Sequence, residues 1–192
     1  HLVYPLKGIQ IADKDERLLL EFNHPTKSSF APLYGFYQPN VQRLLQQKAL
    51  VNPLIKLVLG TEVEAFEQDS NDDLQVFVRP VEQNNFLNFK ASYLLVCNGQ
   101  FSNIADYIDI AVEDFKYNSS VLCVDTRSEH PLTANSYAQT VYNAQYPVTR
   151  FLQNKHQLRF EFQLDKSTLE TAGTPEQVRK MLDASTDGLL QV

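Results

Sequence analysis

The residues whose types and spacing could most readily serve a chemical role are Cys97, Asn98 and Gly99, which follow an apolar run at residues 93–96. An apolar run of this length that stops at Asn-Gly is typical of a buried strand that ends in a tight turn. Open α/β sheets bind their ligands beyond the ends of such strands. The turn is therefore a candidate binding site, although Asn and Gly also meet in ordinary turns that need positive φ.

Other kinds of site have little support in the sequence. The four histidines are widely separated, with no Cys or carboxylate at ligand spacing, so no metal site is expected. There is no Gly-x-Ser-x-Gly elbow and no P-loop, and no catalytic residue is assigned. Cys97 and Cys123 each lie in an apolar run, and we expect both to be buried free thiols rather than a disulfide.

Composition limits the classes of partner. The formal net charge is −6, and Lys and Arg are scattered, whereas nucleic-acid binding needs clustered cations. The chain contains no apolar stretch of about 18 residues, so no membrane partner is expected. Its first residues lack a signal-peptide pattern, and we expect a cytoplasmic protein.

Strands outnumber helices in the expected secondary structure. Two apolar runs at 8–12 and 18–22 flank a charged tip and predict a hairpin. Residues 38–40 introduce a short amphipathic helix that ends by Asn52. The following segment predicts a meander that leads into the run at 93–96, with strands at 55–59, 61–68, 74–80 and 86–90.

The second half continues with β structure after a helical turn that reaches residue 108. Strands are expected at 120–126, 139–143, 148–152 and 158–164. In the last of these, Leu158, Phe160 and Phe162 alternate with polar residues, which predicts one buried face. Thr174 followed by Pro175 is typical of a capped helix start.

Several segments resemble, in serial order, the FAD-dependent aromatic-ring hydroxylases, the single-component flavoprotein monooxygenases of the 3-(3-hydroxyphenyl)propionate hydroxylase type. They are LVYPLKGIQIAD, YGFYQPNVQRLL, GTEVEAFEQDSNDDLQVFV, LLVCNGQFSNIA, VLCVDT and TRFLQNKHQLRFEFQLDKSTLETAGTPEQVRKML. In LLVCNGQFSNIA, Gly99 and Ser102 match the family's second fingerprint. Asn98 stands where the family has Asp, and Ala105 where it has Arg.

The resemblance implies site residues of two kinds. The cofactor-binding residues would be Gln38, Asn98, Gly99 and Ser102, with the Gln38 amide as a hydrogen-bonding partner of the flavin. The substrate-binding residues would be Asn143, Tyr146 and Arg159. Asn143 and Tyr146 replace the family's Asp and Arg, and Arg159 or Arg150 could bind a substrate acid instead. Surface pairing of either arginine, and core packing of Tyr146, are the alternatives.

The implied fold class is α+β, with a mixed or antiparallel substrate-binding sheet beside a β-meander and short helices of a flavin-binding layer. Residues 1–34 and 107–192 would form the substrate-binding sheet, and residues 35–106 a partial FAD-binding layer. An unpaired edge of the flavin layer could pair with a second chain to give a homodimer.

The implied function is that of a central fragment of a monooxygenase that uses FAD and NAD(P)H to hydroxylate a small aromatic substrate. The sequence lacks G-x-G-x-x-G, so we expect weak or no FAD binding and no activity from the isolated chain. One alternative is a shortened, non-catalytic relative that acts as a binding or interaction module. A β-rich carrier of small apolar ligands is another.

Overall fold

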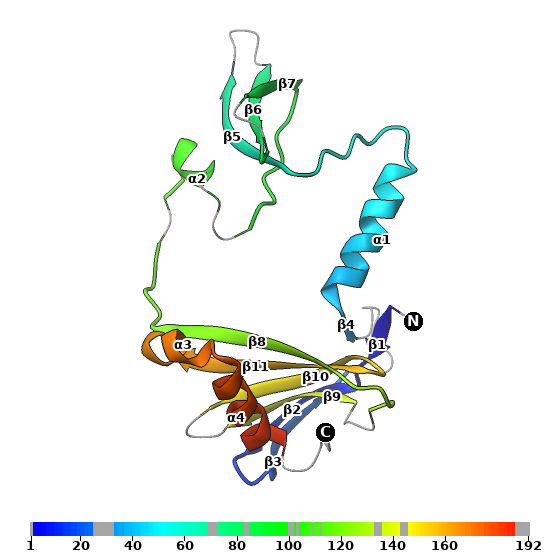
Figure 1. The fold of residues 1–192 in the computed structure, drawn as a ribbon, viewed down its shortest axis with the longest axis vertical. Coiled ribbons are helices and arrows are strands. Elements are labelled where there is room, and N and C mark those ends of the chain that lie inside the picture. Colours follow the sequence, from blue (N-terminus) through cyan, green and yellow to red (C-terminus); the bar gives the residue numbers. More distant parts are fainter. Residues whose placement is uncertain are drawn as a thin grey trace. The chain divides into compact units, whose positions relative to one another are not determined.

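The computed structural model describes ten segments of the chain: residues 2–24, 33–68, 73–82, 85–99, 102, 104–108, 110–111, 113–132, 136–142 and 146–186. The chain divides into two compact units (Figure 1). Unit 1 consists of His1–Leu45 and Lys116–Val192, and unit 2 of Gln46–Phe115. The two ends of the chain thus belong to one unit, and the other unit is an insertion between them.

Unit 1 is built on a six-stranded mixed sheet with the strand order β3-β2-β9-β10-β11-β8 (Figure 1). Neighbouring strands are antiparallel except β2 and β9, which are parallel. This sheet confirms the predicted fold class and the hairpin near the N-terminus. Its strands are β2 (Gly8–Asp13), β3 (Leu18–Asn23), β8 (Ser119–Arg127), β9 (Tyr137–Tyr142), β10 (Val148–Asn154) and β11 (Gln157–Asp165).

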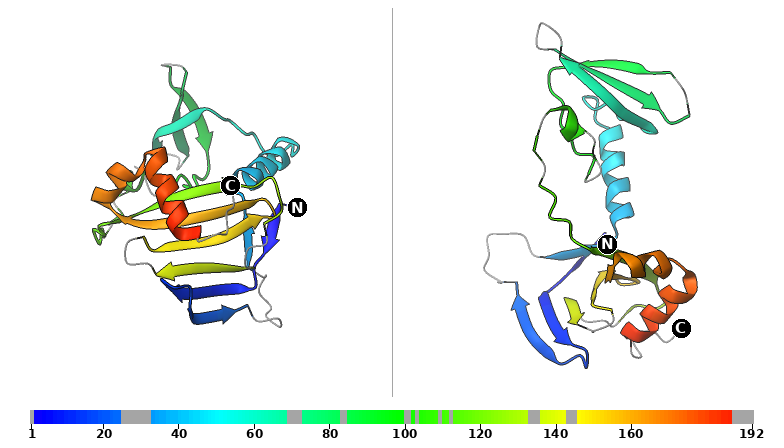
Figure 2. Two further views of the ribbon diagram at one scale, coloured as in Figure 1. Left: turned by 60° about the horizontal axis from the view of Figure 1, so that its bottom comes forward. Right: turned by 90° about the vertical axis from the view of Figure 1, so that its left-hand side faces the viewer.

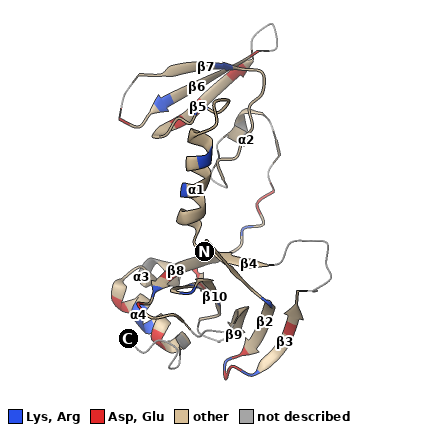
Figure 3. Cartoon of the chain, turned by 90° about the vertical axis from the view of Figure 1, so that its right-hand side faces the viewer, with Lys and Arg blue, Asp and Glu red and all other residues tan. Residues whose placement is uncertain are grey.

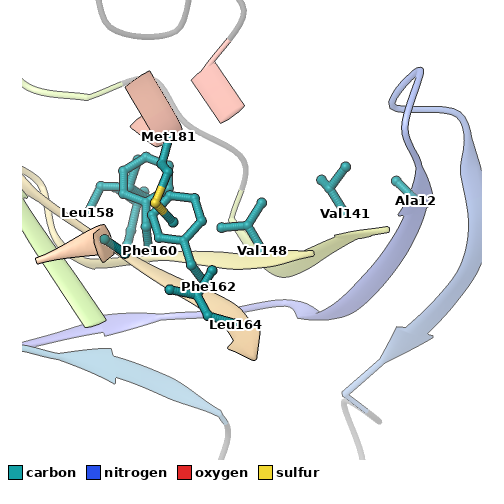
Figure 4. Packing of buried hydrophobic residues seen from close by; sticks show 10 residues of the cluster. Ala12, Val141, Val148, Leu158, Phe160, Phe162, Leu164 and Met181 are labelled. Atoms are coloured by element: carbon teal, nitrogen blue, oxygen red, sulfur yellow. The ribbon is translucent and has the colours of Figure 1, made fainter. Parts of the chain in front are cut away.

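One face of this sheet forms the core of unit 1 beneath α3 (Lys166–Ala172) and α4 (Pro175–Thr186) (Figure 2). Phe160, Phe162 and the α4 residue Met181 are fully buried there (Figure 4). Burial of each phenylalanine contributes about 1.5–3 kcal/mol, so this face supplies much of the unit's stability. The predicted alternation on β11 and the predicted helix start are confirmed, since Thr174 Oγ1 accepts the Gln177 N–H at 3.3 Å.

The opposite face of the sheet changes character from one edge to the other. At the β3 edge it is apolar, because the register places Ile9 opposite Phe22 and Ile11 opposite Leu20. Ile9, Leu20 and Phe22 are exposed. Toward β8 the same face carries Arg159 and Asp125, which are also cross-strand partners.

The turn between β2 and β3 carries residues of both charges (Figure 3). A buried arginine ties this turn to the sheet. Arg150 donates hydrogen bonds to Glu16 (2.8 Å), to Gln139 (2.7 and 3.0 Å) and to the Ser185 carbonyl of α4 (2.8 Å). Because its donors are engaged on the helix-covered face, Arg150 is a structural residue of unit 1.

A two-stranded ribbon that the sequence did not predict packs against β10. It pairs β1 (Val3–Pro5) with β4 (Tyr34–Phe36). Gly35 is buried in β4, and a Cβ atom at this position would lie 1.9 Å from the Leu152 carbonyl oxygen. Only glycine permits such a close approach of one backbone to another.

Unit 2 contains the predicted meander as a three-stranded antiparallel sheet of β5 (Thr61–Gln68), β6 (Leu74–Pro80) and β7 (Leu87–Ala91). The predicted helical turn is also confirmed as α2 (Ile104–Tyr107). Helix α1 (Gln38–Leu50) leads from unit 1 into unit 2 and ends where the sequence predicted. None of its residues is buried, so the expected apolar stripe does not pack into a core.

Two predicted strands are wrong. Residues 55–59 and 93–96 are not in strands, and Tyr93 and Leu95 are 84% and 81% exposed. Among the described residues, no strand offers either run a hydrogen-bonding ladder, and an apolar run becomes a strand only beside such a partner. Both cysteines are free, but the prediction that they are buried is also wrong. Cys97 is exposed and directly follows the run at 93–96, and Cys123 is an exposed position of β8 between half-buried ones.

None of the helices in the described segments is both long and apolar enough to span a membrane.

The close packing of β4 on β10 predicts that Gly35→Ala destabilises the chain by at least about 2 kcal/mol, because the added methyl group meets backbone rather than a flexible side chain. The free energy of unfolding in urea, followed by circular dichroism, measures the effect. Gly173→Ala is the matched control, since Gly173 has φ −71° and nothing within 4 Å of its Cβ position. Equal stability of the two variants would contradict the proposed steric constraint.

The carboxylate that caps α3 predicts a pH dependence. Asp165 Oδ1 accepts the Thr168 N–H at 2.6 Å and the Ser167 hydroxyl at 2.7 Å, and these bonds hold the pKa of Asp165 below its ordinary value of 3.8. The cap therefore stabilises the folded chain above the ordinary pKa, and this contribution is lost as the pH falls through the lowered pKa. In a series of thermal melts, the advantage of the wild-type chain over Asp165→Asn should shrink from about pH 5 to pH 2. An advantage that is constant over this range would exclude a titrating cap.

Candidate functional site

The four predicted cofactor-binding residues are divided between the two units. Gln38 begins α1 in unit 1 and is exposed, whereas Asn98, Gly99 and Ser102 belong to unit 2. Gly99 has φ +84° with nothing within 4 Å of its Cβ position, so the predicted turn does require a glycine. The Ser102 N–H donates to the Gly99 carbonyl at 3.3 Å, and the Ser102 hydroxyl accepts the Ile104 N–H at 3.2 Å. Ser102 thus joins the turn to the start of α2.

Asn98 borders a hollow of about 530 Å³ that lies within unit 2. Its walls are the start of β5, the exposed run before Asn98, and Ile104. Among the described residues of this lining, Glu62 is the only charged one, and its carboxylate lies 3.6 Å from Arg79. The hollow therefore combines an apolar wall with one acidic and a few neutral polar groups.

These residues do not fit FAD without further partners. A pyrophosphate needs cationic side chains or several free backbone N–H groups directed at it. The described lining residues include no Lys or Arg, and the one charge among them, on Glu62, has the wrong sign. The Asn98 amide and the open Cα side of Gly99 would allow close approach of a ligand. The described part of unit 2 thus supplies one wall suited to a cofactor and lacks its electrostatic complement.

The predicted substrate residues lie in different surroundings. Asn143 falls outside the described residues. Tyr146 is half-buried against the core of unit 1, and its hydroxyl accepts a hydrogen bond from the α4 residue Gln177 at 3.2 Å. This contact links the segment before β10 to α4, which is the packing role that the sequence left open.

Arg159 is already paired. Its guanidinium donates to both carboxylate oxygens of Asp125, at 2.8 and 3.1 Å, and lies 3.8 Å from Glu161. The hydrogen bond with Asp125 raises the pKa of Arg159 further above its ordinary value. A substrate carboxylate would have to compete with Asp125 for this guanidinium, so substrate binding by Arg159 stays a prediction.

Gln153 is a residue that the sequence did not single out. It is the extra residue of a β-bulge in β10, between Leu152, opposite Leu158, and Asn154, opposite Gln157. Gln153 is fully buried, and neither atom of its amide has a hydrogen-bond partner among the residues that the structure describes. A buried amide without partners costs about 1–3 kcal/mol, so this side chain is retained at the expense of stability. A lone glutamine in a strand gives no sequence signal for such burial.

This cost predicts that Gln153→Met raises the free energy of unfolding by about 1–2 kcal/mol, because a thioether of similar length needs no hydrogen bond. Gln163→Met, on the exposed side of β11, is the matched control and should change stability by less than about 0.5 kcal/mol. Urea unfolding of both variants tests the difference. A destabilised Gln153→Met would show instead that the amide has a partner.

Within the described segments, no three His, Cys, Asp or Glu side chains come close enough together to hold a metal ion.

Comparison with known proteins gives consistent results. A family model described as "FAD binding domain" matches residues 4–188. A probable NADH-specific resorcinol 4-hydroxylase from Rhodococcus jostii is 25% identical over 121 residues, which is 62% of this chain and 23% of that protein.

Two of the similar solved structures are monooxygenases. The chain matches PqsL, a probable FAD-dependent monooxygenase from Pseudomonas aeruginosa, with a TM-score of 0.70 and 17% identity, over 97% of this chain and 52% of that one. It matches the p-nitrophenol 4-monooxygenase PnpA from Pseudomonas putida with a TM-score of 0.76 and 13% identity, over 98% and 47%. These likenesses confirm the fold class. The chain spans about half the length of these structures and less than a quarter of the curated relative.

Proposed function

Because the chain belongs to the FAD binding domain family, as the match over residues 4–188 shows, we propose that it is the central part of an FAD-dependent aromatic monooxygenase. That match is the observation that carries the proposal, and it agrees with the family that the sequence resembles. FAD is the cofactor in the family's description, and the curated relative is described as NADH-specific. These two descriptions bear out the predicted cofactors, FAD with NAD(P)H as electron donor.

Unit 1 would supply the substrate-binding layer. Its sheet is anchored on one face by α3 and α4, and the other face presents exposed apolar side chains at the β3 edge and hydrogen-bonding groups toward β8. An apolar surface beside polar groups suits a small aromatic ring with a polar substituent. In this role Ile9, Leu20 and Phe22 would exclude water from the ring.

Unit 2 would supply part of the FAD-binding layer. The open turn at Gly99 and the hollow beside Asn98 support this assignment. The described lining of that hollow contains no cation, which supports weak or no FAD binding by the chain alone. The domain bounds proposed from the resemblance, 34/35 and 106/107, lie near the bounds of the compact units at 45/46 and 115/116. The outer strands β5 and β7 offer the edges for the proposed homodimer.

The alternative is a non-catalytic binding or interaction module. Asn98 in place of the family's Asp, and an acidic hollow where a pyrophosphate would need cations, are what a lost cofactor site would leave. Both proposals expect the isolated chain to be inactive, so they have to be separated with a longer polypeptide.

The proposal predicts that the isolated chain quenches FAD fluorescence only above tens of micromolar and supports no NAD(P)H-dependent oxygen uptake, because the described residues of its cofactor wall include no cation. The polypeptide extended through the reading frame on both sides should bind FAD at about micromolar or tighter affinity and oxidise NAD(P)H when a phenol is added. Micromolar FAD binding by the short chain would refute the proposal that its FAD site is incomplete. An extended polypeptide that does not bind FAD would favour the non-catalytic module.

A further inference from the structure

A row of cross-strand neighbours crosses the face of the unit 1 sheet that lies opposite α3 and α4, here called the open face. Each residue of the row is the register partner of the next one, and the row consists of Leu20, Ile11, Thr140, Thr149, Glu161 and Cys123. It is apolar on β3 and β2, carries hydroxyl groups on β9 and β10, and reaches a carboxylate on β11. The open face therefore changes from apolar to anionic along one line.

The guanidinium beside this carboxylate is already held. Arg159 is the one cation within 4 Å of Glu161 in the described part of the chain. Its Nε and Nη2 atoms donate to the two carboxylate oxygens of Asp125 at 2.8 and 3.1 Å, whereas Nη1 lies 3.8 Å from Glu161 Oε1, beyond hydrogen-bonding distance. On β8 the next basic residue is Arg127, four positions from Cys123 and thus roughly 14 Å along the strand. Two carboxylates therefore share one guanidinium, and Asp125 takes its hydrogen bonds.

The Glu161 carboxylate is the group that this cluster leaves available. Its side chain is 33% exposed, and no donor among the described residues forms a hydrogen bond with it. The hydroxyl group of its neighbour Thr149 is hydrogen bonded to the Thr140 hydroxyl at 3.0 Å. A ligand cation or donor would be attracted to such a carboxylate, whereas a ligand carboxylate would be repelled. The charge preference at this end of the open face is therefore opposite to the one expected for Arg159.

We propose that Glu161 is a specificity-determining residue of the substrate face, and that it selects an aromatic compound with an ammonium group on a short alkyl arm. The ammonium group would donate to Glu161, and the ring would lie over the part of the row between Glu161 and Ile11, which are three strand spacings or roughly 14 Å apart. The arm is required because the nitrogen of an aniline is unprotonated at neutral pH and would bring no charge. This inference rests on the proposed function, in which unit 1 supplies the substrate-binding layer.

The test compares three phenols that share an ethyl arm and differ in its end group. Tyramine carries an ammonium group, tyrosol a hydroxyl group and 3-(4-hydroxyphenyl)propionate a carboxylate. Each is titrated into the full 192-residue chain at low salt, and backbone amide shifts are followed by NMR. We expect saturable shifts at Thr149, Glu161 and Cys123, with tyramine binding about fivefold more tightly than tyrosol and about tenfold more tightly than the acid. Because the attraction is electrostatic, added salt should reduce the advantage of tyramine.

Two carboxylate variants separate the roles of the charged residues. Glu161→Gln keeps the shape of the side chain and removes its charge, so it should weaken tyramine binding by about fivefold and leave tyrosol binding unchanged. Asp125→Asn releases the Arg159 guanidinium, so it should strengthen binding of the acid by about fivefold. Glu176→Gln is the matched control and should change none of the affinities, because Glu176 is an exposed α4 residue paired with Lys180 at 2.9 Å. The dispersion of the NMR spectra verifies that each variant is folded.

The outcomes separate this inference from the proposed function. Shifts on the open face with the acid bound as tightly as tyramine, or with wild-type tyramine affinity in Glu161→Gln, would overturn the role of Glu161 and leave unit 1 as the substrate-binding layer. If none of the three phenols shifts amides on the open face, the assignment of unit 1 to the substrate fails together with the role of Glu161.

Discussion

The parallel pairing of β2 with β9 is the constraint on which unit 1 depends. It joins the N-terminal hairpin to strands more than a hundred residues later in the chain, with Gly8 opposite Tyr137 and Asp13 opposite Tyr142. Parallel strands require a long connection, and here that connection contains the whole of unit 2. The buried Arg150 reinforces the same joint, because it holds Glu16 of the hairpin to Gln139 of β9. Without this pairing, β3 and its exposed apolar side chains would not belong to the larger sheet.

Local patterns were enough to predict most strands. The alternation on β11, the meander of β5 to β7 and the capped start of α4 each depend on residues close together in sequence. The errors arose where the outcome depends on distant partners. The runs at 55–59 and 93–96 have strand-like composition but no ladder among the described residues, and β1 and β4 are too short to show a period.

The candidate site was less predictable than the fold. The motif at Asn98 and Gly99 could be located because positive φ favours particular residue types, and Gly99 adopts it. No comparable sequence signal shows whether a side chain is already bound by another part of the chain. Arg159 is held by Asp125 across a strand pair, and the buried amide of Gln153 arises from a bulge whose position depends on the β10–β11 register. Motif spacing can therefore indicate where backbone turns, but not which polar groups remain available to a ligand.

Exposed apolar surface connects the two units to the proposed function. Tyr93 and Leu95 in unit 2, and Leu20 and Phe22 in unit 1, are large apolar side chains that a folded chain normally covers. Those of unit 2 belong to a run with the composition of a buried strand, and those of unit 1 lie on a regular sheet face that suits an aromatic ring. In both units, exposed apolar side chains would be stabilised by burial. In the proposed function, a further structural layer buries those of unit 2 and the substrate buries those of unit 1. A binding module would need a partner for each of these apolar surfaces, whereas the proposed monooxygenase assigns one to a structural layer and the other to its substrate.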